Sequence, residues 1–209
     1  MSTGLRRFRD PARAEPAEPA EPAERCELCA ELLDREHGHV VDLETRALMC
    51  ACRGCRLLFV RPGQGRYRAV PDRFRYAPSF RISPADWDDL GIPVRTAFFF
   101  HNSSLGRTVA FYPSPAGATE SLLPLATWER VIAANPALAD TEPDVEALLV
   151  DRAPDGSFSC HLVPIDACYR LVGLVRLHWK GFGGGREAWE AIDGFFAALR
   201  RRARVLKEV

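Results

Sequence analysis

The clearest pattern of hydrophobic and polar positions lies in the C-terminal part of the chain, from Ile92 onward. The runs VRTAFFF (94–100) and TVAFYPS (108–114) are rich in β-branched and aromatic residues, and the turn sequence HNSSLGR joins them. We therefore predict a β-hairpin here. EALLVDR (146–152) and SFSCHLVPI (157–165) flank the turn sequence APDG and predict a second hairpin.

The same part of the chain predicts three helical segments. SLLPLATWERVIAAN (121–135) has apolar residues at steps of three and four, although Pro124 should delay its start. DACYRLVGLVRLHW (166–179) is apolar almost all round, which is typical of a buried helix. REAWEAIDGFFAALRRRARVLKE (186–208) predicts an amphipathic helix. The order ββαββαα predicts an α+β fold, with an antiparallel sheet built from hairpins and the C-terminal helices on one face.

The N-terminal part divides into three further segments. Residues 1–25 carry the repeat AEPAEPAEPAE, whose prolines exclude helix and sheet, so we expect a disordered tether. Residues 26–60 form a small cysteine-rich module, in which residues 39–50 predict one or two strands and LLFV (57–60) predicts another. Residues 61–91 are an Arg/aromatic-rich connector, and residues 92–209 form the α+β domain.

Composition and charge place the chain among ordinary globular proteins. Its 209 residues are 47% hydrophobic and 27% charged, and 28 basic residues balance 28 acidic ones. No run approaches the roughly 18–20 apolar residues of a membrane span, and no apolar segment follows the two arginines near the N-terminus. We therefore expect a cytoplasmic protein, whose thiols stay reduced and do not form a disulfide framework.

Two CxxC pairs carry the strongest chemical signal in the sequence. Cys26 and Cys29 form the first pair, and Cys52 and Cys55 form the second, with residues 30–51 between them. This spacing is typical of a zinc ribbon or a related treble-clef site, because each CxxC turn directs two thiolates at one point and two turns close a tetrahedron. We predict these four cysteines as metal ligands. Cys50 is a substitute ligand for Cys52, because the two lie two positions apart on an expected strand.

Three points about this site stay open at the level of sequence. His37 and His39 flank Gly38 between the pairs and are either further ligands or a solvated hairpin tip. Rubredoxin-like iron sites commonly carry glycine after the second cysteine of each pair, where this chain has Ala30 and Arg56. We therefore expect zinc in a structural role, with iron as the alternative, because four thiolates leave no position open for a substrate.

The connector holds arginines interleaved with aromatic residues. We predict a partner-binding surface, with a protein as the expected partner because arginine and tyrosine are enriched at protein interfaces. The same mixture also serves RNA or single-stranded DNA. A third interpretation is a solvated surface whose arginines are balanced by acidic residues elsewhere, and the neutral chain agrees with it. The predicted surface consists of Arg66, Arg68, Arg73 and Arg75.

Candidate catalytic residues are few, and we expect a non-enzymatic protein. His101, Ser103 and Ser104 share one turn without the strand–turn–helix setting of a nucleophile elbow. Cys160 and His161 are adjacent on a predicted strand and should therefore point to opposite faces. The GFGGG segment lacks the GK[ST] of a phosphate-binding loop.

Several long phrases resemble an uncharacterised bacterial family that is associated with [NiFe]-hydrogenase gene clusters. They are AFYPSPAGATESLLPL, EPDVEALLV and LVPIDACYRLVGLVRLHWKGFGGGREAWEAIDGFF, and the resemblance runs from about Cys26 to Arg202. It implies an accessory role through contacts with a hydrogenase subunit or maturation factor, and it supplies no catalytic residues. The alternatives are a rubredoxin-like iron electron-transfer protein and a nucleic-acid-binding zinc-ribbon protein.

Overall fold

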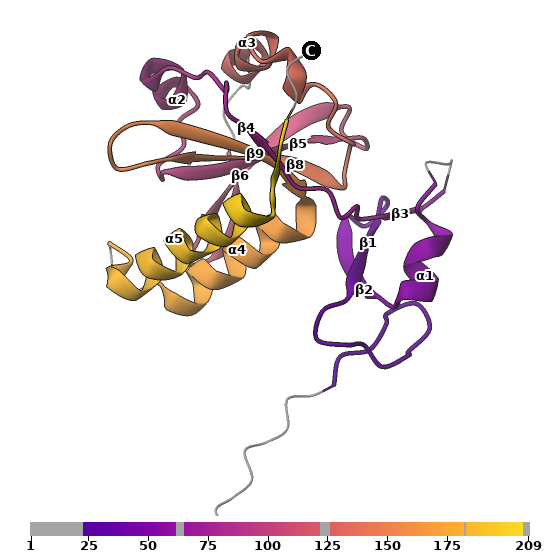
Figure 1. Cartoon of the computed structure of the whole chain (residues 1–209). Coiled ribbons are helices and arrows are strands. Elements are labelled where there is room, and N and C mark those ends of the chain that lie inside the picture. Colours follow the sequence, from indigo (N-terminus) through magenta and orange to yellow (C-terminus); the bar gives the residue numbers. More distant parts are fainter. Residues whose placement is uncertain (1–22, 62–64, 122–125, 182, 207–209) are drawn as a thin grey trace, which may run out of the picture.

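The computed structural model of the protein describes residues 23–61, 65–121, 126–181 and 183–206. These residues form a small three-stranded sheet and a larger seven-stranded sheet (Figure 1). The small sheet has the strand order β2-β1-β3 and is antiparallel throughout. Together with helix α1 and the turn before β1 it forms a unit that we call the cysteine module, and the larger sheet with its helices is the body. The module elements are β1 (Gly38–Asp42), β2 (Ala47–Ala51), α1 (Arg53–Leu58) and β3 (Tyr67–Ala69).

The body is built on a sheet with the order β10-β4-β9-β8-β5-β6-β7. Its pairs are antiparallel except for β10, which lies parallel to β4. The predicted hairpins are present as β5–β6 and β8–β9, so the antiparallel sheet built from hairpins is confirmed. The strands are β4 (Arg75–Ala77), β5 (Thr96–Asn102), β6 (Arg107–Ser114), β7 (Gly117–Glu120), β8 (Glu146–Arg152), β9 (Phe158–Pro164) and β10 (Arg204–Val205).

Helices cover both faces of the large sheet (Figure 1). The C-terminal helices pack on the face that carries Phe98 and Leu149, which confirms the α+β fold with C-terminal helices beside the sheet. The opposite face carries Phe99, whose ring stacks on Trp128 with centroids 3.6 Å apart. The helices are α2 (Pro84–Asp89), α3 (Ala126–Ala133), the 3-10 turn η1 (Pro136–Leu138), α4 (Ile165–His178) and α5 (Gly185–Arg202). No helix in the described ranges is long and apolar enough to cross a membrane.

Three segments differ from the sequence prediction. LLFV was expected to be a strand, but its first two residues belong to helix α1, which ends at Leu58. The Cys52 side chain caps the start of this helix by accepting the Cys55 N–H. The final helix was expected to run to residue 208, but α5 ends at Arg202 and the chain then pairs with β4. Helix α4 is also not buried all round, since the Leu177 side chain is 74% exposed.

The expected connector, residues 61–91, contributes to both sheets. Strand β3 adds to β1 in the module, and β4 adds to β9 in the body. Helix α2 follows, with Ser83 capping its start and Trp87 buried against the body. Most of the expected tether, residues 1–22, lies outside the described residues.

The module packs directly on the body. Val41 and Val70 lie in the same apolar cluster as Ile165 of α4. Polar contacts cross the junction as well: His39 Nδ1 lies 2.9 Å from a carboxylate oxygen of Asp166. Side chains of β1 alternate between two faces, so one face of the module sheet packs on the body and the other packs on the cysteines.

His161 is a fully buried polar residue on β9. Its ring lies between Tyr76 and Phe196, with centroid distances of 5.0 and 6.4 Å. Neither ring nitrogen has a hydrogen-bond partner among the described residues. Burial, with a smaller contribution from the charge of Arg200, lowers the pKa of His161 to about 4.

Because of the buried His161, we expect the free energy of unfolding to fall at acid pH. Its pKa is lowered in the folded state, so the unfolded chain takes up a proton first as the pH falls below about 6.5. The free energy of unfolding should therefore decrease between pH 7 and pH 5, by about 2 kcal/mol from this group. Urea unfolding at both pH values should show His161→Leu losing that decrement, whereas His101→Gln, at an exposed position, should keep it. An unchanged decrement in His161→Leu would contradict the prediction.

Candidate metal centre

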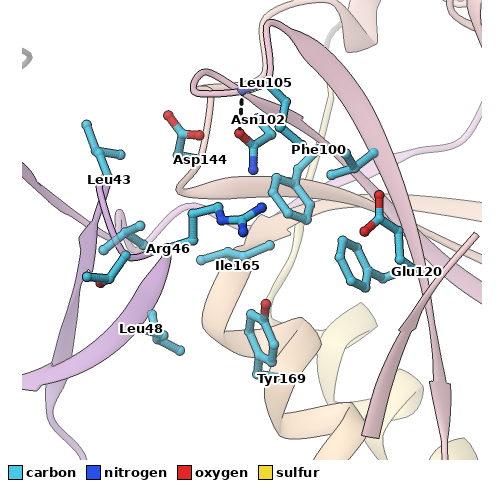
Figure 2. Close-up of a pocket in the computed structure, with 14 residues that line it drawn as sticks. Leu43, Arg46, Leu48, Phe100, Asn102, Leu105, Glu120, Asp144, Ile165 and Tyr169 are labelled. Carbon is cyan, nitrogen blue, oxygen red and sulfur yellow. Dashed lines mark hydrogen bonds between the residues drawn. The ribbon is translucent and has the colours of Figure 1, made fainter.

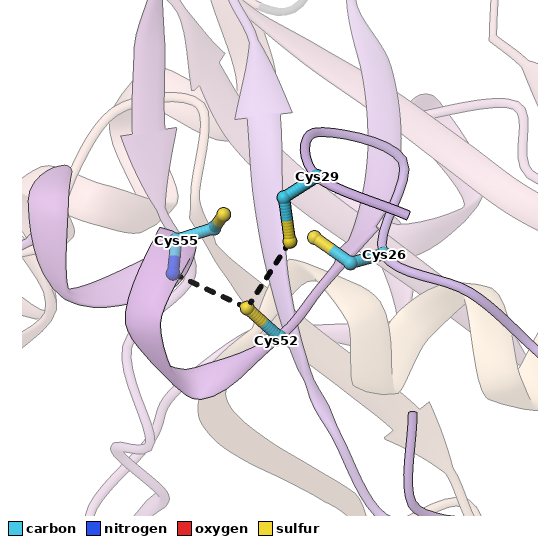
Figure 3. A group of neighbouring side chains, drawn as sticks. All are labelled: Cys26, Cys29, Cys52 and Cys55. Atoms are coloured by element: carbon cyan, nitrogen blue, oxygen red, sulfur yellow. Dashed lines mark hydrogen bonds between the residues drawn. The ribbon is translucent and has the colours of Figure 1, made fainter. Parts of the chain in front are cut away.

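The structure brings the four predicted cysteines together. Sulfur atoms of Cys26, Cys29, Cys52 and Cys55 lie within 4.8 Å of one another. The sulfurs of Cys29 and Cys52 are 3.7 Å apart. Figure 3 shows the four side chains turned toward one another, two from the turn before β1 and two from the start of α1. A first cysteine turn, the β1–β2 hairpin and helix α1 therefore follow one another along the chain.

Local backbone hydrogen bonds build both cysteine turns. In the first turn, Ala30 N–H donates to the carbonyl oxygen of Cys26 at 2.8 Å. In the second, Cys55 N–H donates to the sulfur of Cys52 at 3.4 Å, and Arg56 N–H donates to the Cys52 carbonyl. Of these donors only the Cys55 N–H reaches a sulfur, and it lowers the pKa of Cys52, but the hydrogen bond with Glu31, burial and the Cys29 thiol raise that pKa overall.

The apolar core beneath the cysteines is very small. Besides Cys26 and Cys52, its fully buried members are Val40 and Ala51. A core of this size cannot offset the conformational entropy of ordering the segment. The module therefore needs either a bound metal or its packing on the body to fold.

Electrostatics in the cluster favour a cation. Burial raises the pKa of Cys26, but backbone groups of Cys52, Leu28 and Cys29 outweigh it and lower that pKa to about 6. The pKa of Cys55 is raised, first by its hydrogen bond with the Cys29 thiol, then by burial and by the nearby Cys26. Four thiolates can coexist here only around a positive charge, so metal binding must release protons.

Cys50 does not lie with the four cysteines. It is the cross-strand partner of His39, and its sulfur groups with His37 and His39 instead. This placement favours Cys52 over Cys50 as the fourth thiolate, although ligation itself stays a prediction.

The backbone at Ala30 bears on the choice between zinc and iron. Its φ is +63°, the left-handed conformation that glycine adopts without strain. The turn therefore has the geometry of a glycine-containing knuckle without the glycine. The absence of glycine at position 30 does not by itself distinguish zinc from iron.

Ala30→Gly is expected to stabilise the module. The left-handed conformation costs an L-residue about 1–2 kcal/mol, and the greater freedom of glycine in the unfolded chain offsets part of the gain. We expect a net gain of about 0.5–1 kcal/mol, measured as slower zinc loss to a chelator and a higher urea midpoint. Ala198→Gly, at an exposed position of α5, should change the midpoint in the opposite direction. A faster zinc loss in Ala30→Gly would contradict the argument.

The four predicted partner-binding arginines have different surroundings. Arg66 binds Asp42 through a bidentate pair and lowers the pKa of that carboxyl strongly. Arg68 donates to the Pro143 carbonyl at 2.9 Å, and Arg73 donates to Glu146 at 2.7 Å. Within the described part of the chain, only Arg75 of the four has no hydrogen bond or ion pair from its side chain. Partner binding by these residues stays a prediction, but three of them already have an intramolecular role.

The catalytic candidates are not brought together. Cys160 lies in the apolar cluster that contains Trp128, whereas His161 faces Phe196 on the opposite side of the sheet. Ser104 lies in the β5–β6 turn and donates to the carbonyl of Leu43 at 3.0 Å, which is a contact between body and module.

A cavity of about 380 Å³ lies at the junction of module and body (Figure 2). Its walls combine apolar side chains, including Phe100, Ile165 and Tyr169, with polar groups that include Arg46 and Asp144. Asp144 accepts the Ser103 N–H, and its second carboxylate oxygen is buried with no hydrogen bond in the described structure but lies 3.8 Å from the guanidinium of Arg68. Sequence reasoning missed this cavity because its walls come from distant segments. Its lining residues suit binding of a small apolar molecule with a polar end better than nucleophilic catalysis.

Comparisons with known proteins give one match. Residues 25–203 match the model of a family described as "Family of unknown function (DUF5947)". This range agrees with the range over which the sequence resembles an uncharacterised family, and the description mentions no hydrogenase. Neither a curated protein nor a solved structure matches the chain.

Proposed function

The chain belongs to the DUF5947 family, whose function is unknown, and we propose that it is a non-enzymatic accessory protein with one structural zinc ion. The observation that carries the proposal is the convergence of four cysteine sulfurs from two turns above a very small core. Zinc would be held by Cys26, Cys29, Cys52 and Cys55, and it would fasten the first turn to the start of α1. Four thiolates close the coordination sphere, so the ion stabilises the fold and has no position for a substrate.

The outer surface of the module supports a role in protein contacts. Helix α1 has no buried residues and lies on the side of the module away from the body (Figure 1). Leu57, Leu58 and Val60 are 58%, 75% and 54% exposed. Adjacent exposed apolar side chains of this kind mark interaction surfaces, whereas single ones are common everywhere. We propose that this apolar patch contacts a protein partner.

The proposed partner is a [NiFe]-hydrogenase subunit or maturation factor. This part of the proposal rests on the sequence resemblance alone. Two other functions remain to be separated from it: rubredoxin-like electron transfer by an iron centre, and nucleic-acid binding by the module. An oxidised iron–thiolate centre is red whereas a zinc centre is colourless, and nucleic-acid binding would weaken steeply with salt.

Metal analysis and partner capture test the proposal together. Protein purified under reducing conditions should be colourless and contain one tightly held zinc per chain. Tagged wild-type protein expressed in its native cells should capture hydrogenase components, identified by mass spectrometry. The double variant Leu57→Ser, Leu58→Ser should lose capture and keep zinc, because both side chains are exposed. Leu177→Ser, on an equally exposed position of α4, is the matched control and should keep both.

Other outcomes would overturn parts of this proposal. A red iron centre would replace the zinc proposal with electron transfer. Capture that survives in the Leu57→Ser, Leu58→Ser variant would place the partner surface elsewhere. Protein without any metal would remove the structural site altogether.

A further inference from the structure

A second group of metal-ligating side chains lies on the other face of the module sheet. Ring nitrogens of His37 and His39 and the sulfur of Cys50 lie within 4.8 Å of one another. His39 and Cys50 are direct partners across β1 and β2, so their side chains share a face of the sheet. The ring centroids of His37 and His39 are 5.0 Å apart. This is the face that packs on α4, away from the four-cysteine cluster.

Hydrogen bonds fix both imidazole rings in the same state. His37 Nδ1 lies 3.0 Å from the carbonyl oxygen of Asp34, which can only accept, so Nδ1 carries the proton. His39 Nδ1 likewise donates to Asp166 at 2.9 Å. A neutral imidazole protonated at Nδ1 presents a lone pair at Nε2. Both rings therefore offer Nε2 as a metal ligand.

The Nε2 atom of His37 has no partner. The side chain of His37 is only 10% exposed, and its Nε2 is buried without a hydrogen bond in the described structure. A buried, unpartnered nitrogen costs about 1–3 kcal/mol unless something binds it. For His39, the carboxylate of Asp166 supplies the supporting contact that metal-binding histidines almost always have.

We propose that His37, His39 and Cys50 form a second metal site, with three protein ligands and a fourth position open to an exchangeable ligand. Imidazole and thiolate together suit a divalent ion from the later first-row transition metals, such as zinc or cobalt. Ligand bonds of about 2.0–2.3 Å hold such atoms closer together than the 4.8 Å limit within which they lie here, so binding would draw the three side chains toward the ion.

The proposed site lies beside a cavity and at the junction between the module and the body. His37, His39 and Asp166 also line a cavity of about 450 Å³ between the module and the body. The two histidines of the proposed site therefore border an opening, whereas Cys50 is not among the residues that line it. Because Asp166 belongs to α4, the site spans the two parts of the fold, and its occupancy would strengthen their junction.

Cobalt titration tests the site. Wild-type protein that already holds one zinc is titrated with Co²⁺, whose visible bands report coordination and whose near-ultraviolet thiolate band reports a sulfur ligand. We expect one equivalent of cobalt to bind with a thiolate band while the zinc stays in place. Cys50→Ser should lose the thiolate band, and His39→Gln should lose cobalt binding. His101→Gln, at an exposed histidine, is the matched control and should titrate like wild type.

Asp166→Asn keeps the test informative if a ligand variant fails to fold. The amide cannot hold His39 as the carboxylate does, so cobalt affinity should fall about 10–100-fold while the zinc content is unchanged. The absence of a thiolate band in wild type, or a band that persists in Cys50→Ser, would overturn the second site. Loss of the tightly held zinc in Cys50→Ser would also overturn it, because Cys50 would then belong to the four-cysteine cluster. If wild type holds no zinc, the four-cysteine proposal fails, and Cys50-dependent cobalt binding still decides the second site.

Discussion

Cys29→Ser is expected to release the tightly held zinc and unfold the cysteine module. The four-cysteine cluster sits on a core with very few fully buried residues, so metal binding and folding of the module should be a single event. Structural zinc in small modules contributes about 10–16 kcal/mol, far more than that core can supply. The body, with two extensive apolar clusters of its own, should stay folded.

Hydrogen exchange with zinc analysis measures this result. Amides of β1 and β2 should lose protection in Cys29→Ser, while those of β5 and β8 should keep it. Cys55→Ser should behave in the same way. Cys50→Ser is the matched control, because its sulfur lies outside the four-cysteine group, and it should keep both zinc and protection. Protected β1 and β2 amides in metal-free Cys29→Ser would mean that packing on the body, through Val41 and Val70, suffices to fold the module.

The features that were predictable from sequence are those with local causes. Each CxxC turn is formed within a few residues, and the two hairpins of the body join neighbouring segments with strong turn sequences. The wrong prediction at LLFV shows that apolar composition alone does not distinguish a strand from a helix. Its apolar residues suggested a strand, but the capping sulfur of Cys52 starts a helix there and leaves Leu57 and Leu58 exposed.

The features that were not predictable depend on contacts between distant residues. His39 and Asp166 are 127 positions apart, so only the folded chain shows that one orients the other. The parallel pairing of β10 with β4 likewise joins two ends of the body that no local signal connects. In the arginine-rich segment the positive charges are visible in the sequence, but their acidic partners are not. These partners lie on β1, on β8 and in the loop before β8.

The ion pair of Arg73 and Glu146 carries the largest expected effect outside the metal site. The Glu146 side chain is completely buried, and the Arg73 side chain is 29% exposed. Arg73 Nε donates to one carboxylate oxygen of Glu146 at 2.7 Å, and Nη2 donates to the other. The Glu142 N–H donates to the same carboxylate at 3.0 Å. This one guanidinium and one backbone amide are therefore the hydrogen-bond donors to the buried Glu146 side chain in the described structure.

Arg73→Ala should consequently lower the free energy of unfolding at pH 7 by about 3–5 kcal/mol, because it leaves a buried charge without its partner. Arg75→Ala, two positions away on β4 and without an ion pair in the described structure, should change it by less than about 0.5 kcal/mol. The double variant Arg73→Met, Glu146→Leu should recover most of the loss, since replacing both partners by apolar residues removes the unpaired charge. Urea unfolding of the four proteins measures these differences. If Arg73→Ala and Arg75→Ala are equally stable, Arg73 is not needed for stability and is available to bind a partner. If Arg73→Ala loses stability as expected, a loss of partner binding in any Arg73 variant could result from unfolding. Arg75 is then the position at which partner binding can be tested without a large change in stability.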